Sequence, residues 1–393
     1  MQKNYETKEE NTMATLKFEA KELTNAFAHV GAVVNQKSAL SILNNVVFDY
    51  KDGKVALIGS DNETWLFLMC KPIESGDNQD FRFCVNASDM LGALKNIGDT
   101  RIDVVVDNEK NIVTCNYGNG KFTLPIMDAE EFPMPQKNEE YNNKFQLDAQ
   151  CLLKDVECVR FASADDPLRL VMNSVHFDFG DNNSLTTVST DGRLLAKRND
   201  KGVSAENTLA GENFTMPKKP AALVASLVRE TSDNVEIAFN ENTCVVSNAD
   251  FRLVTRLHEQ RFPNYNSVIP QDHKMQVCVD NAQLQQALRR VMPLGNAMSG
   301  LVIMEFEKGR VTIKAEDIDF SKSASETLTC DYDAGEKFTI GFKGASLMDA
   351  IKNVEDETLV MEFTEPSRPC VVYANATSTR EEYLVLVMPM LIN

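Results

Sequence analysis

Acidic pairs occur at several places in this 393-residue chain, and paired carboxylates could hold Mg²⁺ for a hydrolytic reaction. They include Asp165–Asp166, Glu316–Asp317 and Glu381–Glu382. However, no set of three acids recurs in one strand–turn context. Solvated loops explain each pair better than a metal centre, so we expect no catalytic residue and no metal site.

Other residue types that could do chemistry are equally dispersed. The four histidines show no HxxxH spacing: His29, His176, His258 and His273. The stretch "GNGKFT" (118–123) resembles a phosphate loop, but Cys115 stands where the leading glycine belongs. It lies between two alternating runs, which predicts a hairpin turn. No GxGxxG or GxSxG occurs, so we expect no cofactor.

Composition limits the class of protein further. The nine cysteines form no CxxC and their number is odd, which favours free thiols in a reducing cytoplasm. No apolar run approaches the roughly 20 residues that span a bilayer, and we expect no membrane partner. Residues 1–12 are polar, lack the apolar core of a secretion signal and are interpreted as a disordered leader. The net charge of −18 disfavours a protein that coats nucleic acid, unless basic residues gather on one surface.

The stretch "TVSTDGRLLAK" (187–197) places a small polar turn directly before two leucines. Asp191 could be a catalytic acid, but no His or Lys stands at a suggestive spacing from it. We therefore interpret Asp191 as a turn residue whose side chain accepts hydrogen bonds from its own backbone. Leu194 and Leu195 would then be apolar residues at the rim of a surface site.

A threefold repeat organises the chain. Segments beginning at Leu16, Asn143 and Met275 each read as an alternating strand, a polar cap and then a helix. The apolar residues at helical spacing are Leu23, Phe27 and Val30; Leu152, Val156 and Val159; and Leu284, Leu288 and Val291. A second trio of strand–helix segments aligns on Phe81, Phe214 and Phe338.

The repeat predicts an α+β fold of three similar domains, each with two helices packed on antiparallel sheets. The expected boundaries are 1–12 for the leader and 13–138, 139–270 and 271–393 for the domains. Like domains joined head to tail by short linkers form an arc that can close into a ring. Helices would then lie along one side and a continuous sheet along the other.

Several motifs in this order resemble one known family. They are "SALSILNNVVF" with "GSDNET", "EEFPMP", "TVSTDGRLLA", "RFPNYNSVIP" and "VMPM". On these residues the chain resembles the bacterial sliding clamp, the beta subunit of DNA polymerase III. The resemblance implies a head-to-tail homodimer that forms a six-domain ring with helices lining the hole. Such a ring is a processivity factor that slides on double-stranded DNA without sequence preference and is not an enzyme.

The resemblance also implies partners and a location. A hydrophobic cleft would take short linear motifs from the replicative polymerase alpha subunit, the clamp-loader delta subunit, other DNA polymerases and mismatch-repair proteins. The expected location is the bacterial cytoplasm, associated with the nucleoid during replication.

Three sets of residues carry these roles in the resemblance. The peptide-binding cleft is expected at Met172, Thr190, Gly192, Arg193, Leu194, Leu195, Pro263, Val268, Met298, Leu386, Met388, Pro389 and Met390. DNA-facing residues are expected at Lys37, Lys95, Arg169, Lys218, Lys219, Arg289 and Lys352. The dimer interface is expected at Lys121, Phe122 and Met292.

This chain departs from the family pattern beside the cleft and along the helices. Lys343 and Ser346 stand where relatives often carry Asn and Tyr, and three further residues follow "VMPM". Acidic neighbours on the helices, among them Asp155, predict that the lining of the hole is not uniformly basic. Two alternatives stay open: an acidic scaffold that binds only proteins, and a nuclease with carboxylate-bound Mg²⁺. Basic residues on repeated helices favour the ring.

Overall fold

The computed structural model describes residues 13–35, 38–75, 79–136, 139–166, 168–200, 203–332 and 336–392. The leader predicted at residues 1–12 and the DNA-facing residue predicted at Lys37 lie outside these ranges. The chain divides into two units, one comprising Met1–Asn142 with Ser226–Arg256 and the other Asn143–Ala225 with Leu257–Asn393. The three domain boundaries expected from the repeat stay a prediction.

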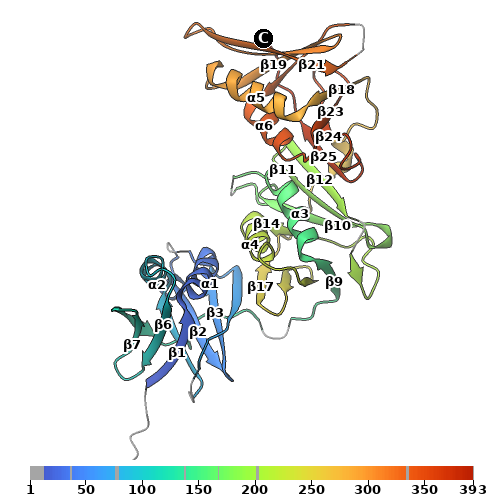
Figure 1. The fold of residues 1–393 in the computed structure, drawn as a ribbon. Coiled ribbons are helices and arrows are strands. Elements are labelled where there is room, and N and C mark those ends of the chain that lie inside the picture. The colour runs from blue at the N-terminus through green and yellow to red at the C-terminus, as the bar shows by residue number, and fades with distance from the viewer. Residues whose placement is uncertain are drawn as a thin grey trace, which may run out of the picture. The chain divides into compact units, whose positions relative to one another are not determined.

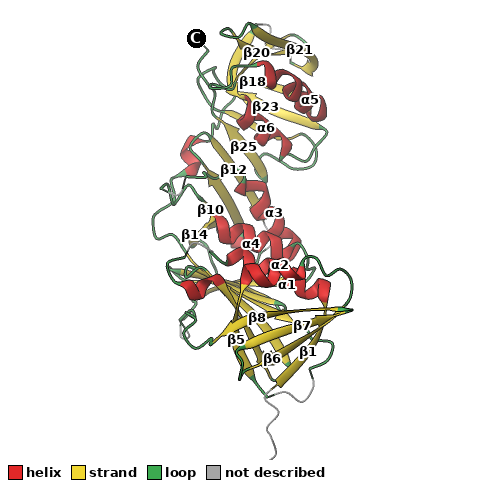
Figure 2. Ribbon diagram, turned by 90° about the vertical axis from the view of Figure 1, so that its left-hand side faces the viewer, coloured by secondary structure: helices red, strands yellow, loops and turns green. Residues whose placement is uncertain are grey.

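The first unit is an antiparallel sheet with helices on one face (Figures 1 and 2). Its strands lie in the order β1 (Met13–Glu19), β6 (Arg101–Asp107), β7 (Ile112–Tyr117), β8 (Gly120–Met127), β5 (Phe81–Asn86), β2 (Asn45–Lys51), β3 (Lys54–Ser60), β4 (Thr64–Cys70), β17 (Phe251–Arg256), β16 (Thr243–Ser247) and β15 (Asn234–Phe239). Two helices pack together against these strands: α1 (Ala20–Val33) and α2 (Ala87–Leu94).

The second unit repeats this construction. Its longer sheet has the order β14 (Asn213–Pro217), β10 (Ser174–Phe179), β11 (Leu185–Thr190), β12 (Leu194–Asp200), β25 (Tyr383–Val387), β24 (Cys370–Ala374), β23 (Thr358–Phe363), β18 (Met275–Asp280), β21 (Lys322–Asp331), β20 (Arg310–Asp317), β19 (Leu301–Glu307) and β22 (Phe338–Lys343). Strand β9 (Asn143–Asp148) pairs with β13 (Ser204–Ala205). The remaining helices are α3 (Ala149–Arg160), α4 (Lys218–Val228), α5 (Asn281–Val291) and α6 (Gly344–Lys352).

Local sequence explains where the helices begin and which face they bury. Asn86, Asp148 and Asp280 are N-caps whose side chains accept hydrogen bonds from amides of the first helical turn. The periodic apolar residues predicted for α1, α3 and α5 are all buried. The α+β prediction and the helical spacing of the repeat are therefore confirmed. The "GNGKFT" stretch is the predicted hairpin: it joins β7 to β8, and Gly118 has a positive φ of 44°.

One prediction about the helices is wrong. Asp155 was expected on a solvent-facing lining, but it is only 1% exposed and lies on the buried face of α3. Its Oδ1 accepts a hydrogen bond from Arg198 Nε at 2.8 Å, while its Oδ2 has no hydrogen-bond partner among the described residues. Burial raises the pKa of Asp155 to about 7 despite the neighbouring guanidinium. None of the described helices is both long and apolar enough to cross a membrane.

Candidate functional site

The turn between β11 and β12 is held by its own side chains. The amides of Arg193 and Leu194 donate to Asp191 Oδ1 at 2.7 and 2.6 Å. Thr190 Oγ1 accepts from the Gly192 amide at 3.0 Å and donates to the Leu194 carbonyl at 2.6 Å. Asp191 is therefore a structural turn residue, and this prediction is confirmed. Its carboxylate fixes the shape of the turn.

The chain near its C-terminal end runs from this turn to an edge strand. Strand β25 lies antiparallel to β12 (Figure 1), and the Met388 amide then donates to the Arg193 carbonyl at 2.8 Å. Two residues later, the Met390 amide donates to the Gly341 carbonyl of β22 at 2.8 Å. A Cβ atom at Gly341 would lie 2.9 Å from Leu301 Cδ1 and 3.0 Å from Ile392 Cγ1, so only glycine permits this approach.

An apolar floor lies under this strand junction. It is the buried cluster of Val188, Leu195, Phe262, Tyr265, Ile269, Val371, Leu384 and Leu386. Other predicted cleft residues are exposed: Val268 is 50%, Met388 38% and Met298 97% exposed. The structure therefore separates the predicted cleft residues by burial. Thr190, Leu194, Leu195 and Leu386 are buried, and Leu195 and Leu386 belong to the floor, whereas the methionines, Val268 and Pro263 are accessible.

Basic side chains stand at the edge of the turn. Arg169, predicted to face DNA, donates to Met172 Sδ, and its Nη2 lies 3.3 Å from where a Cβ at Gly192 would be. Gly192 also has a φ of +87°, so a side chain there would be both crowded and strained. Arg169 thus lies beside the predicted cleft. Arg193 and Lys343 are exposed as well, the latter next to Gly300.

The first unit contains a second copy of the turn with a different outcome. Asp61 Oδ1 accepts from the amides of Glu63 and Thr64 at 3.1 and 2.8 Å, just as Asp191 does in the second unit. Trp65 occupies the position equivalent to Leu195. Its side chain is buried, and its Nε1 donates to the Pro133 carbonyl at 2.8 Å. The indole is therefore part of a buried cluster in the first unit, at the position where the second unit has a leucine.

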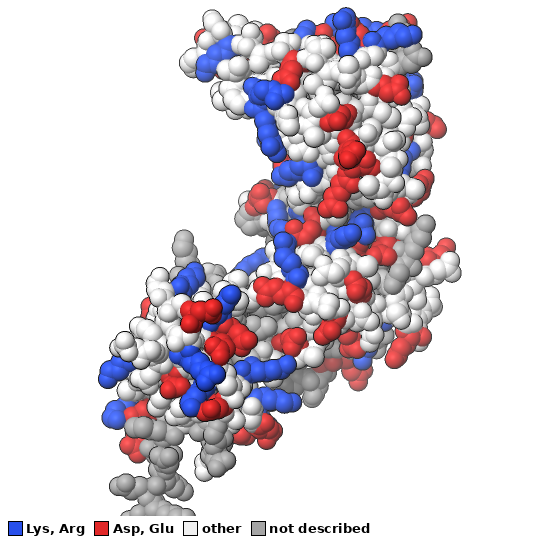
Figure 3. Space-filling model, in the orientation of Figure 1, with Lys and Arg blue, Asp and Glu red and all other residues white. Residues whose placement is uncertain are grey.

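The predicted DNA-facing residues lie on or beside helices. Lys95 caps the C-terminus of α2, Lys352 ends α6 and Arg289 lies in the last turn of α5, and all three are exposed. Cations are favourable at helix C-termini, where the backbone carbonyls are unpaired. Lys218 is half-buried and Lys219 is exposed, and Lys218 Nζ lies 2.6 Å from Asp165 Oδ1. Basic and acidic side chains are interspersed over the face shown in Figure 3.

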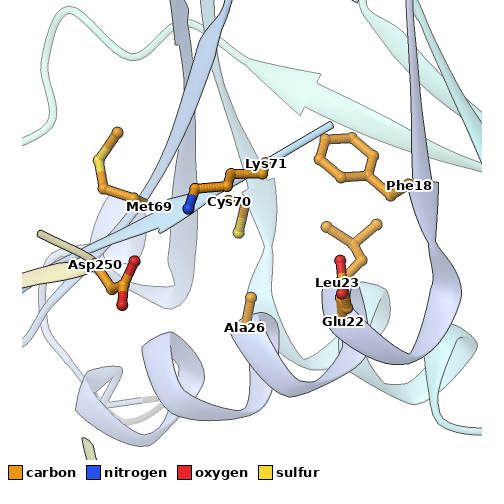
Figure 4. Close-up of a pocket in the computed structure, with 8 residues that line it drawn as sticks. All are labelled: Phe18, Glu22, Leu23, Ala26, Met69, Cys70, Lys71 and Asp250. Carbon is orange, nitrogen blue, oxygen red and sulfur yellow. The ribbon is translucent and has the colours of Figure 1, made fainter. Parts of the chain in front are cut away.

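The first unit contains a cavity of about 220 Å³. It lies between α1 and β4 and is lined partly by the apolar Phe18, Leu23 and Met69 (Figure 4). Burial raises the pKa of the Cys70 thiol in this cavity to about 12, so the thiol stays protonated near neutral pH. Within the described ranges, no group of three or more His, Cys, Asp or Glu residues could hold a metal ion.

The histidines have structural environments. The His176 ring stacks on Phe262 with centroids 4.5 Å apart, and its Nδ1 lies 2.9 Å from Thr215 Oγ1. Burial lowers the pKa of His176 to about 4, so this ring is neutral and supports the floor of the cleft. His29 and His273 lie near Glu230 and Glu362, at 3.3 and 3.4 Å.

Comparisons with known proteins match almost the whole described chain. Models of the N-terminal, central and C-terminal domains of the DNA polymerase III beta subunit match residues 15–136, 146–264 and 266–390. The chain belongs to the DNA polymerase III beta subunit family. It therefore contains the three clamp domains of that family in their usual order.

Relatives in this family are distant but similar along their full length. The beta sliding clamp of Streptococcus pneumoniae is 24% identical over 369 residues, which cover 92% of this chain and 94% of the relative. The beta sliding clamp of Haemophilus influenzae is 24% identical, with coverage of 93% and 97%.

Solved structures of the family share the fold. The beta subunit from Thermotoga maritima has a TM-score of 0.87 at 24% identity, with 97% of this chain and 100% of that chain covered. A Pseudomonas aeruginosa clamp bound to griselimycin has a TM-score of 0.89 at 21% identity, with coverage of 96% and 100%.

Sequence reasoning missed two features beside the cleft. One is the position of Arg169 against Met172, and the other is the approach of Met390 and Ile392 to Gly341. An arginine three residues before a methionine in a loop gives no periodic signal. The glycine at position 341 interrupts an otherwise bulky strand, "FTIGFK", and such an isolated glycine is typical of close backbone approach.

Proposed function

We propose that this protein is a DNA sliding clamp. Two copies close head to tail into a ring that encircles duplex DNA and tethers DNA polymerases to it, and the ring itself catalyses no reaction. Each copy consists of the domains 13–138, 139–270 and 271–393. The observation that carries the proposal is a strand junction that occurs twice within the chain and leaves matching edges for a third.

The two junctions within the chain have the same register. In the first unit, Leu68 of β4 pairs with Phe251 of β17. In the second, Arg198 of β12 pairs with Tyr383 of β25. In both junctions the first paired residue lies seven residues after the first residue of the four-residue turn, which is Asp61 in one case and Asp191 in the other. The two junctions therefore superpose residue by residue.

Strands β21 and β8 are equivalent to the two strands of the internal junctions. Within the described residues, each of them has a neighbouring strand on one side only at its start. Strand β21 follows the same four-residue turn, because Asp317 pairs with Lys322 as Thr190 does with Leu195. Among the described residues, the start of β21 pairs only with β20, and the start of β8 pairs only with β7. Transferring the register predicts that Phe122 of one copy pairs with Ser323 of the other.

Burial supports this closure. Phe122 is equivalent to Leu253 in one internal junction and to Val385 in the other, and both of these are fully buried. Phe122 is only half-buried, so an apolar ring is left for a partner to cover. Lys121 lies beside it on the same edge, and Met292 packs at the end of α5 in the third domain. These three residues form the proposed dimer interface.

DNA is held by topology rather than by strong contacts. The exposed Lys95, Arg289 and Lys352 lie at helix ends, and together with Lys218 and Lys219 they supply phosphate contacts on the helical side. Several of these cations have acidic neighbours; Lys352 Nζ, for example, lies 2.5 Å from Asp349. Paired cations bind phosphate weakly, which suits a ring that has to slide.

The cleft beside the Asp191 turn is the proposed tether. Accessible methionines adapt to varied side chains, and the apolar floor can bury the anchor residues of a short peptide. Its lining comprises Met172, Thr190, Gly192, Arg193, Pro263, Val268, Met298, Met388, Pro389 and Met390, with Leu194, Leu195 and Leu386 beneath. The proposed partners are the polymerase alpha subunit, the clamp-loader delta subunit, other DNA polymerases and mismatch-repair proteins, in the bacterial cytoplasm on the nucleoid.

Retention on closed DNA tests the ring. Light scattering is expected to give about twice the 43.9 kDa chain mass. Protein loaded by a clamp loader onto nicked circular DNA is expected to remain bound through gel filtration and to be lost once the circle is linearised. Equal retention on both DNA forms, or a monomer at micromolar concentration, would contradict the ring and favour an acidic scaffold that binds only proteins.

A further inference from the structure

In each internal junction, one further backbone hydrogen bond forms just beyond the last paired residues. It joins the turn before the first strand of the junction to the residue that follows the last pair on the second strand. In the first unit, the Arg256 amide donates to the Glu63 carbonyl at 2.9 Å. Their side chains also meet, with Arg256 Nη1 3.5 Å from Glu63 Oε1. In the second unit, the Met388 amide makes the same bond to the Arg193 carbonyl at 2.8 Å. These two positions therefore reach each other across a junction.

The equivalent positions in the proposed third junction are Pro125 on β8 and Phe320 in the turn before β21. Pro125 has no amide hydrogen, so the bond that closes both internal junctions cannot form here. Phe320 is 71% exposed and has no carboxylate with which to form an ion pair. An exposed proline and an exposed aromatic ring thus replace a hydrogen bond and a charged contact.

We infer that Phe320 of one copy packs against Pro125 of the other, and that this apolar contact closes the junction between copies. The inference rests on the proposed ring and names a contact particular to this chain. The occupant is a second copy because Pro125 lies three residues after Phe122 on β8 and continues the edge that is proposed to pair with β21. The adjoining Ile318, which is 81% exposed, enlarges the apolar surface on the same turn.

At the junction between copies, an apolar contact takes the place of a hydrogen bond and a charged contact, and this has a physical consequence. The internal junctions continue their backbone ladder into the turn, whereas the junction between copies stops one bond earlier, at Thr123. Its last contact is apolar and is little affected by salt, unlike the Glu63–Arg256 pair, which is exposed and screened. The chain therefore makes its reversible junction chemically different from its two permanent ones.

Exchanging the pair for the one in the first unit tests the inference. The dimer dissociation constant would be measured by sedimentation equilibrium for wild type, Phe320→Glu, and Phe320→Glu combined with Pro125→Arg. Phe320→Glu is expected to weaken the dimer by about tenfold or more. The double variant regains an amide donor and an ion pair, so it should recover most of this loss and become more sensitive to salt than wild type.

A control uses another exposed apolar residue away from both edges. Leu168 is 90% exposed, and Leu168→Glu is expected to leave the dissociation constant unchanged. If wild type dimerises but Phe320→Glu dimerises equally well, the contact is refuted and the ring stands. If wild type is a monomer, the ring itself fails and the contact with it. Failure of the double variant to recover affinity would likewise overturn the pairing of these two positions.

Discussion

Removing the Asp191 carboxylate should weaken peptide binding more than it weakens the fold. In Asp191→Ala the amides of Arg193 and Leu194 lose a charged acceptor that now lies 2.7 and 2.6 Å away. Hydrogen bonds to charged groups contribute about 1.5–3 kcal/mol each, but this turn is partly exposed and water can replace the carboxylate. We therefore estimate a net cost of about 2 kcal/mol for holding the turn in its bound shape.

The expected effect on affinity follows from that cost. If a peptide binds only when the turn is ordered, a cost of about 2 kcal/mol lowers its affinity roughly 30-fold. If the peptide requires only part of the turn to be ordered, the expected loss of affinity is roughly tenfold. The assay is fluorescence anisotropy with a labelled peptide that carries Leu and Phe anchors. Urea unfolding, measured alongside, is expected to show a loss of stability of about 1–2 kcal/mol.

The first unit supplies the matched control. Asp61→Ala removes the same type of turn carboxylate, with acceptor distances of 3.1 and 2.8 Å, but its turn adjoins the buried Trp65. This variant is expected to lose similar stability while binding the peptide like wild type. Wild-type affinity in Asp191→Ala, or an equal loss of affinity in Asp61→Ala, would refute the assignment of the cleft to the second unit.

Three further outcomes are expected. Deleting Met388–Asn393 should abolish peptide binding, because it removes the chain that bridges Arg193 to β22, and light scattering should still show a dimer. Trp65→Ala should lower the free energy of unfolding by about 3–5 kcal/mol in urea titrations, because it empties a filled core position. The pKa of Asp155 is raised to about 7 in the fold, so the folded state holds a proton that the unfolded chain releases above pH 4. Unfolding free energy should therefore fall as pH rises from about 4 to 7, by at most about 1.4 kcal/mol per pH unit, and Asp155→Asn should lose this slope.

The sequence predicts those parts of the fold that depend on neighbouring residues. Helical spacing identifies the buried faces of α1, α3 and α5 because a helix presents residues three and four apart on one side. The structural role of Asp191 was predictable for the same reason: an aspartate before glycine bonds amides two and three residues later. The threefold repeat then extended these local predictions to the whole chain.

Contacts between distant segments were not predictable in this way. Asp155 appeared to be one of several charged residues on a helix surface, and only the pairing of β12 places Arg198 beneath it. The equivalent positions in α1 and α5 are Ala26 and Ala287, which are buried without charge. Replacing a buried alanine by one member of a buried ion pair does not change the spacing of the apolar residues, so the sequence pattern gives no sign of it. Arg169 is expected to face DNA because its loop matches a DNA-contacting position in the resemblance, and its position beside Met172 and Gly192 has no signal in the sequence.

One strand–turn unit serves three different purposes in this chain because a few side chains differ. The backbone bonds of the Asp61 and Asp191 turns are the same, so the turn itself does not decide the outcome. Trp65 is buried beside the first turn, whereas the second turn has the smaller Leu195 at that position. In the third, Phe320 presents an apolar surface where the first has a glutamate. Under the proposed function, the buried indole belongs to a permanent junction, the leucine lies below a peptide-binding cleft, and the exposed phenylalanine meets a second copy. Differences at these positions, rather than in the fold, would then decide which junction is sealed, which binds peptides and which can open.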